Sequence, residues 1–306
     1  MNGESFSQTV RRELVHKRAV SEVLVTSVAD QDGTWIVHAQ LPRQHSFHTD
    51  GVGRQCSYYD PLLVLEAFRQ GCIASSHLFY DAPPDARHTV RLYELSVVDF
   101  DHLQCGPEML DLELTIVVQK EFRRGEDQGA VHGLEVRAVA AHEGTKTIEL
   151  AAAFNWMPLE KWDRMRAGAS WDPGPQPAPA EAASVGRTRT ENVVIGAPVH
   201  TVEERSATAP LVVDIGHATL FDHPLDHLPG GLIIEAARQL SLAIADTRAE
   251  SLVGPSWLKI EFQSFVEMDA VSSVAMTQDA AEPLTFRGDI TQSGNTRATI
   301  ELAFME

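Results

Sequence analysis

The sequence has no apolar run near the roughly 20 residues needed to cross a bilayer. Residues 1–15 are polar and lack the apolar centre of a secretory signal, so we expect none. Cysteine is also scarce: Cys56, Cys72 and Cys105 are scattered and form no C-x-x-C pair. This usage favours reduced thiols over a disulfide framework. Together, these absences predict a cytoplasmic protein that does not use a membrane.

Positive charge is scarce as well, with 25 Lys and Arg against 43 Asp and Glu, for a formal net charge of −18. A mean field of this sign repels polyphosphate, so we expect no nucleic-acid partner. A small phosphorylated substrate remains compatible with the composition, because one or two arginines in a cleft reverse the potential locally.

A proline-rich stretch near the middle of the chain divides the sequence. From Trp171 onward it reads Trp-Asp-Pro-Gly-Pro-Gln-Pro-Ala-Pro-Ala, with no apolar periodicity. This composition is typical of an extended, solvated linker. We therefore expect one domain at 1–160, a linker at 161–190 and a second domain at 191–306.

The two halves show the same order of elements, and the strands alternate apolar and polar residues as half-buried strands do. In the first half we expect strands at 20–28 and 34–41, a helix at 61–78, and strands at 90–99, 109–121, 131–141 and 147–155. In the second half we expect strands at 192–195 and 211–215, a helix at 230–246, and strands at 256–265, 270–278, 284–291 and 296–304. A charged hairpin tip is expected around Glu126 and Asp127.

The two expected helices carry the clearest sign of repetition. One contains Glu66-Ala-Phe-Arg69-Gln70 and the other contains Glu235-Ala-Ala-Arg238-Gln239, with a constant offset of 235 − 66 = 169. A match at identical spacing inside matching contexts indicates tandem repetition.

Both helices are apolar on nearly every side, and such helices are normally buried. One buried helix followed by four antiparallel-type strands, twice over, indicates a sheet wrapped around a central helix. The predicted fold class is therefore α+β, a double hot-dog with two tandem domains.

On a helix, positions i, i+3 and i+4 share one face, so the Glu, Arg and Gln of each helix project together. A carboxylate among apolar residues needs a partner to stay ionised. One interpretation is a structural Glu–Arg ion pair. The other makes Glu235, and less strongly Glu66, a general base or orienting carboxylate, with Arg238 and Arg69 gripping an anionic substrate beside Gln239 and Gln70.

The loop before the second helix contains His223, His227 and then Pro-Gly230-Gly231. A histidine there can transfer protons near neutral pH, and backbone N–H groups at Gly230 and Gly231 can polarise a carbonyl. The alternative is a pair of surface histidines. Pro224 disfavours a regular helix across the histidines and no third ligand is evident, so we expect no metal site. We also expect no cofactor.

The first half has tyrosines, Tyr58 and Tyr59, where the second has these histidines, and its imidazoles at His45 and His48 come from an earlier segment. The two candidate pockets are therefore not chemically equivalent.

With these residues in view, the chain resembles the A-factor synthase (AfsA-like) family of actinobacterial γ-butyrolactone and butenolide signal biosynthesis. The resemblance covers nearly the whole chain. The motifs that carry it are Val15-His-Lys-Arg, Glu22-Val-Leu-Val-Thr, Ala39-Gln-Leu-Pro-Arg43-Gln-His45-Ser-Phe, Asp60-Pro-Leu-Leu-Val-Leu-Glu66-Ala-Phe-Arg69-Gln70, Phe154-Asn-Trp156, and Phe221-Asp-His223-Pro-Leu-Asp-His227-Leu-Pro-Gly230 with Glu235-Ala-Ala-Arg238-Gln239. The second-half motif also looks like that of acyl-carrier-protein dehydratases, although its His-to-Glu separation is a little shorter.

The resemblance implies an acyltransferase that joins a β-ketoacyl group, carried on acyl carrier protein or another thioester, to dihydroxyacetone phosphate. It implies Arg238 or Arg69 on the phosphate, Glu235 or a histidine as base, and helix-start N–H groups on the oxyanion. The alternatives are a thioesterase or dehydratase on carrier-protein thioesters, and a non-catalytic acyl-ligand binder. Since carrier proteins are acidic, docking needs a basic patch, for which the linker offers Arg164, Arg166, Arg187 and Arg189 unless these are simply solvated. Single hot-dog domains usually pair helix to helix. Two fused copies can make that pairing within one chain, so both a monomer and a homodimer are compatible with the sequence.

Overall fold

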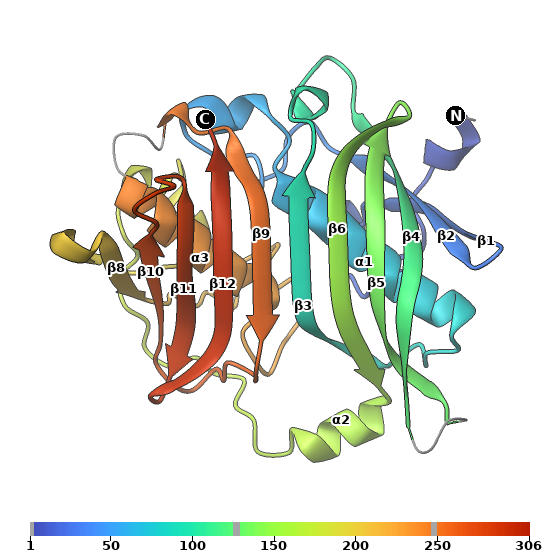
Figure 1. Cartoon of the computed structure of the whole chain (residues 1–306). Coiled ribbons are helices and arrows are strands. Elements are labelled where there is room, and N and C mark those ends of the chain that lie inside the picture. The colour runs from blue at the N-terminus through green and yellow to red at the C-terminus, as the bar shows by residue number, and fades with distance from the viewer. Residues whose placement is uncertain (1–2, 125–128, 246–249) are drawn as a thin grey trace. The chain divides into compact units, whose positions relative to one another are not determined.

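The structure is a computed structural model that describes residues 3–124, 129–245 and 250–306. It divides into two compact units, coloured in chain order in Figure 1. Unit 1 comprises residues 1–44 and 59–167, and unit 2 comprises residues 45–58 and 168–306. Within the described ranges, no helix combines the length and the apolarity that a membrane crossing requires.

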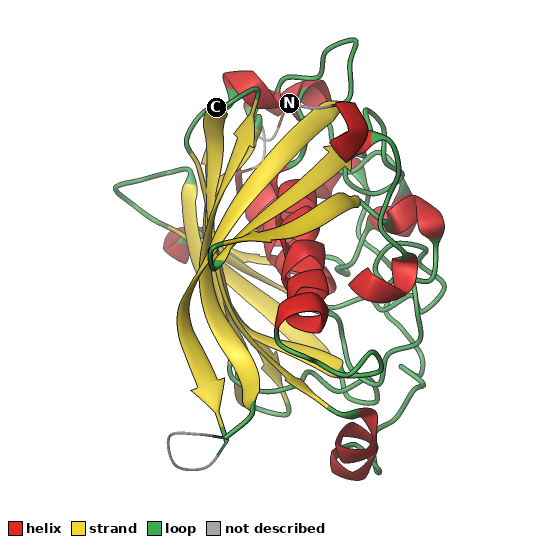
Figure 2. Cartoon of the chain, turned by 90° about the vertical axis from the view of Figure 1, so that its right-hand side faces the viewer, coloured by secondary structure: helices red, strands yellow, loops and turns green. Residues whose placement is uncertain are grey.

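Unit 1 is an antiparallel sheet with one long helix, α1, against one face (Figures 1 and 2). Its strand order is β1-β2-β4-β5-β6-β3, and every pairing is antiparallel. The bounds are Val25–Gln31 for β1, Thr34–Leu41 for β2, Arg87–Val97 for β3, Leu110–Arg123 for β4, Val131–His142 for β5 and Thr145–Met157 for β6. The predicted strands of this half are confirmed, except that 20–22 form a 3₁₀ turn before β1.

Helix α1, Pro61–Phe79, begins where the sequence provides a cap and a rigid first residue. The Asp60 carboxylate accepts a hydrogen bond from the Leu62 N–H at 3.0 Å, and Pro61 has no N–H to leave unsatisfied. The apolar residues around the helix are buried, as its pattern predicted. This burial fixes the direction in which Glu66, Arg69 and Gln70 project.

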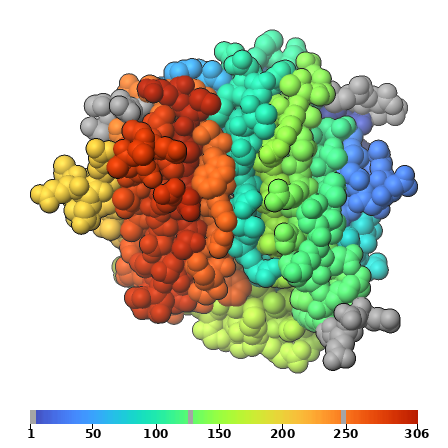
Figure 3. All heavy atoms as spheres, in the orientation of Figure 1, coloured from blue at the N-terminus to red at the C-terminus, as the bar shows by residue number. Residues whose placement is uncertain are grey.

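Unit 2 repeats the arrangement with helix α3, Gly230–Ala245, and a sheet in the order β9-β12-β11-β10-β8-β7. The bounds are Val199–Thr201 for β7, Ser206–Pro210 for β8, Gly254–Phe262 for β9, Ser272–Gln278 for β10, Thr285–Gln292 for β11 and Asn295–Met305 for β12. In the space-filling view of Figure 3, atoms of β9 to β12, orange to red, form the surface of unit 2 that faces the viewer. The double hot-dog fold is therefore confirmed.

Two predicted strands of this half, 192–195 and 211–215, are wrong. The strands of this stretch, β7 and β8, lie between them. The Val194 N–H donates to the Gln239 side chain, the Val194 carbonyl accepts from Val212 N, and Ile195 forms an isolated bridge with Leu211. At the Val194 N–H, the side-chain oxygen of Gln239 therefore takes the place of a backbone carbonyl from a neighbouring strand. The predicted helix end at Asp246 and the predicted hairpin tip at Glu126 and Asp127 lie outside the described residues.

A short helix, α2 (Leu159–Met165), follows β6, and residues 171–179 are mostly exposed. Residues 180–187 instead pack into unit 2, where Ala180 donates to Ile195 O and Val185, Gly186 and Arg187 are buried. The 3₁₀ turns are η1 (Gly3–Phe6), η2 (Arg12–Val15), η3 (Val20–Glu22), η4 (Gly53–Ser57), η5 (Asp101–Leu103), η6 (Ala183–Val185), η7 (Thr190–Asn192) and η8 (Val202–Glu204).

Candidate functional site

In unit 2, the three polar residues of α3 meet in one buried cluster centred on Glu235. Its Oε2 accepts from Arg238 Nε at 2.8 Å and lies 2.6 Å from Arg238 Nη2. Its Oε1 accepts from Gln239 Nε2 at 2.6 Å. The Glu235 side chain is only 1% exposed, so its charge depends on these partners. The prediction that the three project together is confirmed.

A second guanidinium completes this cluster, and the sequence reasoning missed it. Arg187 Nε donates to Glu235 Oε1 at 2.8 Å, and its Nη2 lies 2.6 Å from the same oxygen. Arg187 Nη1 donates to Phe47 O and Asp50 O, and its guanidinium carbon lies 4.5 Å from the centre of the Phe47 ring. The planar fork thus satisfies a carboxylate, two carbonyls and an aromatic face at once.

This placement corrects one expectation for the linker. Arg187 was a candidate for a solvated basic patch, yet it is buried and held by Glu235. Of the other candidates, Arg164 is exposed near Glu160, and Arg189 is exposed. Arg187 therefore belongs to the interior of unit 2, because the chain from Ala180 onward turns inward with η6.

Unit 1 contains the same cluster around Glu66. Arg69 Nε and Nη2 donate to its two oxygens at 2.7 and 2.9 Å, and Gln70 Nε2 donates to Oε1 at 2.9 Å. The second cation here is Lys17, whose Nζ lies 3.0 Å from Glu66 Oε1. A carboxylate, an arginine, a glutamine and one further cation thus recur in both units.

The glutamines tie each helix to the segment that supplies the cation. Gln70 accepts from Leu24 N and donates to Glu22 O, and Gln239 accepts from Val194 N and donates to Asn192 O. The positions 22, 24 and 17 correspond to 192, 194 and 187 at an offset of 170. This offset is the sequence signal that could have identified Lys17 and Arg187: the repeat reaches back from the helices to Val15-His-Lys and Val185-Gly-Arg.

The two clusters differ in exposure. The Glu66 and Arg69 side chains are 20% and 30% exposed, against 1% and 7% for Glu235 and Arg238. Burial acts to raise the pKa of Glu66, but Arg69 and Lys17 outweigh it and hold that pKa well below its ordinary value of 4.5. Glu66 is therefore an ionised carboxylate that orients Arg69 and is a weak base.

The loop before α3 places its histidines beside its aspartates. His227 Nδ1 lies 2.6 Å from Asp226 Oδ1, and Asp226 is buried. His223 Nδ1 lies 3.5 Å from Asp222 Oδ2. A carboxylate on Nδ1 fixes the tautomer of His227 and directs Nε2 outward from the pair, which is the arrangement of an oriented proton-transfer group.

Helix α3 starts with the two glycines in the first turn. The N–H groups of Leu232 and Ile233 already donate to Pro229 O at 3.0 and 3.3 Å. Of the first four amides of the helix, those of Gly230 and Gly231 are therefore the ones that can meet a ligand carbonyl. A side chain at Gly230 would come within 3.2 Å of Phe262, so the position suits glycine.

A third histidine, His217, joins the buried network next to Glu235. Its Nδ1 accepts from Thr219 N and Leu220 N, so its Nε2 donates to Asn192 Oδ1 at 3.1 Å. Asn192 in turn donates to Asp50 Oδ2 at 2.7 Å. Burial lowers the pKa of His217, which keeps the ring neutral. No residue pattern in the sequence singled out this histidine.

Side chains close enough together to bind one metal ion are found in unit 1, away from the loop that contains His223 and His227. Within 3–124, 129–245 and 250–306, the one group of three or more suitable ligands is His16, His77 and His88, in unit 1. Neither His223 nor His227 belongs to it.

Comparisons with known proteins give the family and the fold. The family model described as the A-factor biosynthesis hotdog domain matches twice, at residues 2–167 and 168–302. A Streptomyces virginiae protein named 2-oxo-3-(phosphooxy)propyl 3-oxoalkanoate synthase is 33% identical over 86% of this chain and 85% of its own. A Streptomyces coelicolor protein of the same name is 32% identical over 79% and 76%. Among solved structures, the pyran synthase domain from module nine of the sorangicin pathway superposes with a TM-score of 0.52 and 14% identity, covering 92% of this chain and 97% of that domain.

Proposed function

Because the chain belongs to the A-factor biosynthesis hotdog family, we propose that it is an acyltransferase making a phosphorylated β-keto ester. The donor is a β-ketoacyl thioester, carried on acyl carrier protein, and the acceptor is dihydroxyacetone phosphate. The observation that supports this assignment is the similarity to synthases named for that ester, which extends over most of both chains. We further propose that this ester is an intermediate of γ-butyrolactone or butenolide biosynthesis, which the match to the A-factor biosynthesis hotdog family supports.

The reaction requires one bond exchange at the thioester carbonyl. The acceptor hydroxyl oxygen attacks the carbonyl carbon, a C–O bond forms, the C–S bond breaks, and the hydroxyl proton passes to the departing thiolate. Three tasks follow for the protein: removing that proton, stabilising the oxyanion and holding the phosphate.

We assign proton removal to His227, held by Asp226 at 2.6 Å, with His223 as the neighbouring imidazole of the loop. The Gly230 and Gly231 N–H groups, at the positive end of the α3 dipole, polarise the carbonyl. Both carboxylate oxygens of Glu235 are taken up by guanidinium groups, so we assign it the task of orienting Arg238.

For the phosphate, both arginines remain candidates: Arg238 lies in the same unit as His227 and Gly230, and Arg69 of unit 1 has the more exposed side chain. Glu66 holds two of the guanidinium nitrogens of Arg69, which orients the fork toward an anion. Gln70 and Gln239 use both amide hydrogens on protein acceptors, so we assign them positioning roles.

The conditions of the reaction follow from the same assignment. We propose that the protein works in the cytoplasm, where Cys56, Cys72 and Cys105 stay thiols, that it uses no membrane or nucleic acid, and that it needs no cofactor. It works as a monomer or a homodimer.

The test is mass spectrometry of products from the purified chain given a β-ketoacyl thioester with and without dihydroxyacetone phosphate. We expect the phosphorylated ester only when both are present. Free acid formed equally in both reactions would indicate a thioesterase, and loss of water would indicate a dehydratase; either result rejects the proposal.

A His227→Gln variant tests the assigned base. It should lose about 10²–10⁴ in kcat, because a positioned general base contributes that much. The matched control is His200→Gln, at an exposed histidine of β7, which should retain full activity. Equal activity in both variants would remove His227 from the mechanism.

A further inference from the structure

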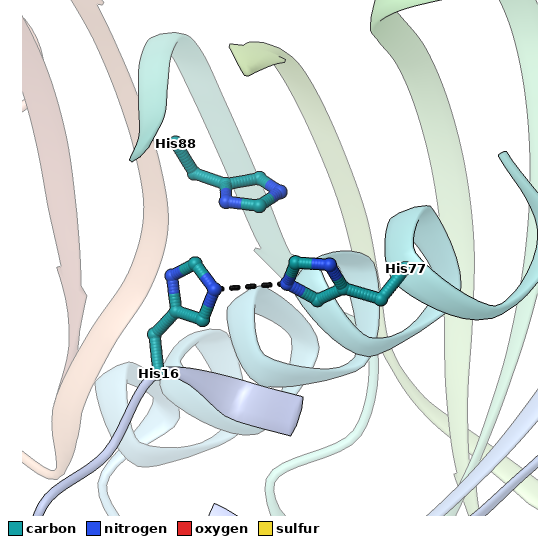
Figure 4. A group of neighbouring side chains, drawn as sticks. All are labelled: His16, His77 and His88. Atoms are coloured by element: carbon teal, nitrogen blue, oxygen red, sulfur yellow. Dashed lines mark hydrogen bonds between the residues drawn. The ribbon is translucent and has the colours of Figure 1, made fainter. Parts of the chain in front are cut away.

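Three imidazoles in unit 1 converge from segments far apart in the sequence. His16 follows η2, His77 lies in the last turn of α1, and His88 is the second residue of β3. One ring nitrogen of each lies within 4.8 Å of the other two, and the ring centres are 4.9 to 5.3 Å apart. Figure 4 shows the rings gathered around a common space.

The hydrogen bonds of His77 identify its available nitrogen. Its Nδ1 lies 2.9 Å from Ala82 O, and since a carbonyl only accepts, Nδ1 carries the proton. In the neutral ring, Nε2 therefore holds a lone pair. That lone pair faces His16, whose Nε2 is 2.8 Å away (dashed line in Figure 4).

The same reasoning applies to His88. The Ser76 hydroxyl donates to Ile73 O at 2.7 Å, so it accepts from His88 Nε2, 2.8 Å away. His88 Nδ1 is then a lone-pair acceptor, and it is a buried atom with no hydrogen-bond partner. A buried acceptor nitrogen without a partner lowers stability unless a hydrogen-bond donor or a cation binds to it.

The hydrogen-bond acceptors next to His77 and His88 are of the kind that surround the histidine ligands of metal centres. Ligating histidines nearly always donate their second N–H to a carbonyl or similar acceptor, as His77 does to Ala82 O and His88 to Ser76 Oγ. Tetrahedral zinc, with Zn–N of about 2.0–2.1 Å, needs nitrogens about 3.3 Å apart. Side-chain adjustments of about 1 Å from the present spacing therefore reach that geometry.

Unit 2 has no counterpart to this cluster at the positions that can be matched. His16 has φ 56°, and the position related to it by the offset of 170 is Gly186, with φ 75°. A non-glycine residue in this conformation carries strain of about 1–3 kcal/mol. By sheet register, His88 pairs with Trp156 next to the strand end, and the corresponding pair is Pro255 with Phe304. Unit 1 therefore has an imidazole, His16, at the left-handed position where unit 2 has the unstrained Gly186.

We propose that His16, His77 and His88 bind one divalent transition-metal ion of the zinc type. The ligand atoms are Nε2 of His16, Nε2 of His77 and Nδ1 of His88, and water takes the fourth position. On binding, the His16 proton moves from Nε2 to Nδ1, so each ring stays neutral and no net proton is released. The ion fastens the segment after η2 to α1 and β3, directly before Lys17, which pairs with Glu66.

The experiment uses the whole purified chain, stripped with chelator and then dialysed against micromolar Zn²⁺. Elemental analysis should give about one zinc per chain, and titration with Co²⁺ should give the visible bands of a four-coordinate ion. Neither readout depends on enzymatic activity.

Two variants and one control locate the ion. His16→Asn keeps a residue that tolerates the left-handed backbone, and His88→Gln keeps a donor for Ser76, so both should show wild-type far-UV dichroism. Each should bind Zn²⁺ at least about 100-fold more weakly. His200→Ala, at an exposed site in unit 2, should bind like the wild type. A wild-type chain without stoichiometric zinc, or equal loading of all variants, would overturn the site and leave the proposed acyl transfer unaffected.

Discussion

The two units hold the same four-residue cluster in two different states. Around Glu235 the second cation is Arg187, and the group is sealed; around Glu66 it is Lys17, and Arg69 keeps 30% of its side chain exposed. Because the arginine fork meets several acceptors at once, two guanidinium groups can be buried around Glu235 in unit 2. In unit 1 the Lys17 side chain is also buried, at 6% exposed, and it is Glu66 and Arg69 that lie closer to solvent. We infer that duplication preserved a structural anchor and left one copy more open to a ligand.

Removing the carboxylate should separate the two copies most strongly. Glu235→Ala leaves Arg187 and Arg238 buried without a counter-charge, which should lower the free energy of unfolding by about 3–5 kcal/mol. Glu66→Ala should cost less, roughly 1–3 kcal/mol, because Arg69 can reach water although the buried Lys17 also loses its counter-charge. Urea unfolding of both variants measures the difference. Equal losses would contradict the contrast in burial.

Exchanging the cations is a milder form of the same comparison. Arg187→Lys forfeits the contacts to Phe47 O, Asp50 O and the Phe47 ring, so we expect a loss of about 2–3 kcal/mol. Lys17→Arg keeps the charge next to Glu66, so the only cost is fitting a larger side chain at a buried site, about 1 kcal/mol. Thermal unfolding of the pair checks the order; a larger effect at Lys17 would reverse our interpretation.

The left-handed position before each cation offers a third contrast. Gly186→Ala should destabilise by about 1–3 kcal/mol, since its φ is 75° and the new Cβ would meet the Leu242 side chain. His16→Gly should leave metal-free stability within about 1 kcal/mol, because relief of strain offsets the lost ring. Denaturant midpoints for both variants give the comparison. A strongly destabilised metal-free His16→Gly would show that the ring is needed for packing alone.

The smallest effect concerns pH. The folded-state pKa of Glu66 lies below its unfolded value, so the folded chain binds fewer protons in that window, and stability is lost as pH falls from about 5 through the folded pKa. A Glu66→Gln variant cannot titrate, and its stability should fall less steeply with acid. Unfolding midpoints across this range test the sign. An identical slope in both proteins would mean that Glu66 has an ordinary pKa in the folded state.

Much of the architecture was predictable because periodicity records burial directly. The apolar surfaces of α1 and α3, the constant offset of 169 and most strand bounds follow from local patterns. The strands expected at 192–195 and 211–215 are wrong because glutamine side chains replace strand partners: Gln239 accepts from the Val194 N–H, and Gln176 accepts from the Val213 N–H. Local sequence does not encode such a partner.

In the candidate site too, some contacts follow from local sequence and others depend on the tertiary structure. Spacing alone placed Glu, Arg and Gln on one face of each helix, since helix geometry fixes side chains three and four residues apart. Only the tertiary structure brought Arg187 to Glu235, 48 residues away in the chain, and His16 to His77, 61 residues away. Those contacts depend on the path of the intervening chain. The repeat offset marks Lys17 and Arg187 as equivalent positions, but only the tertiary structure places Arg187 on Glu235 and brings the three imidazoles together.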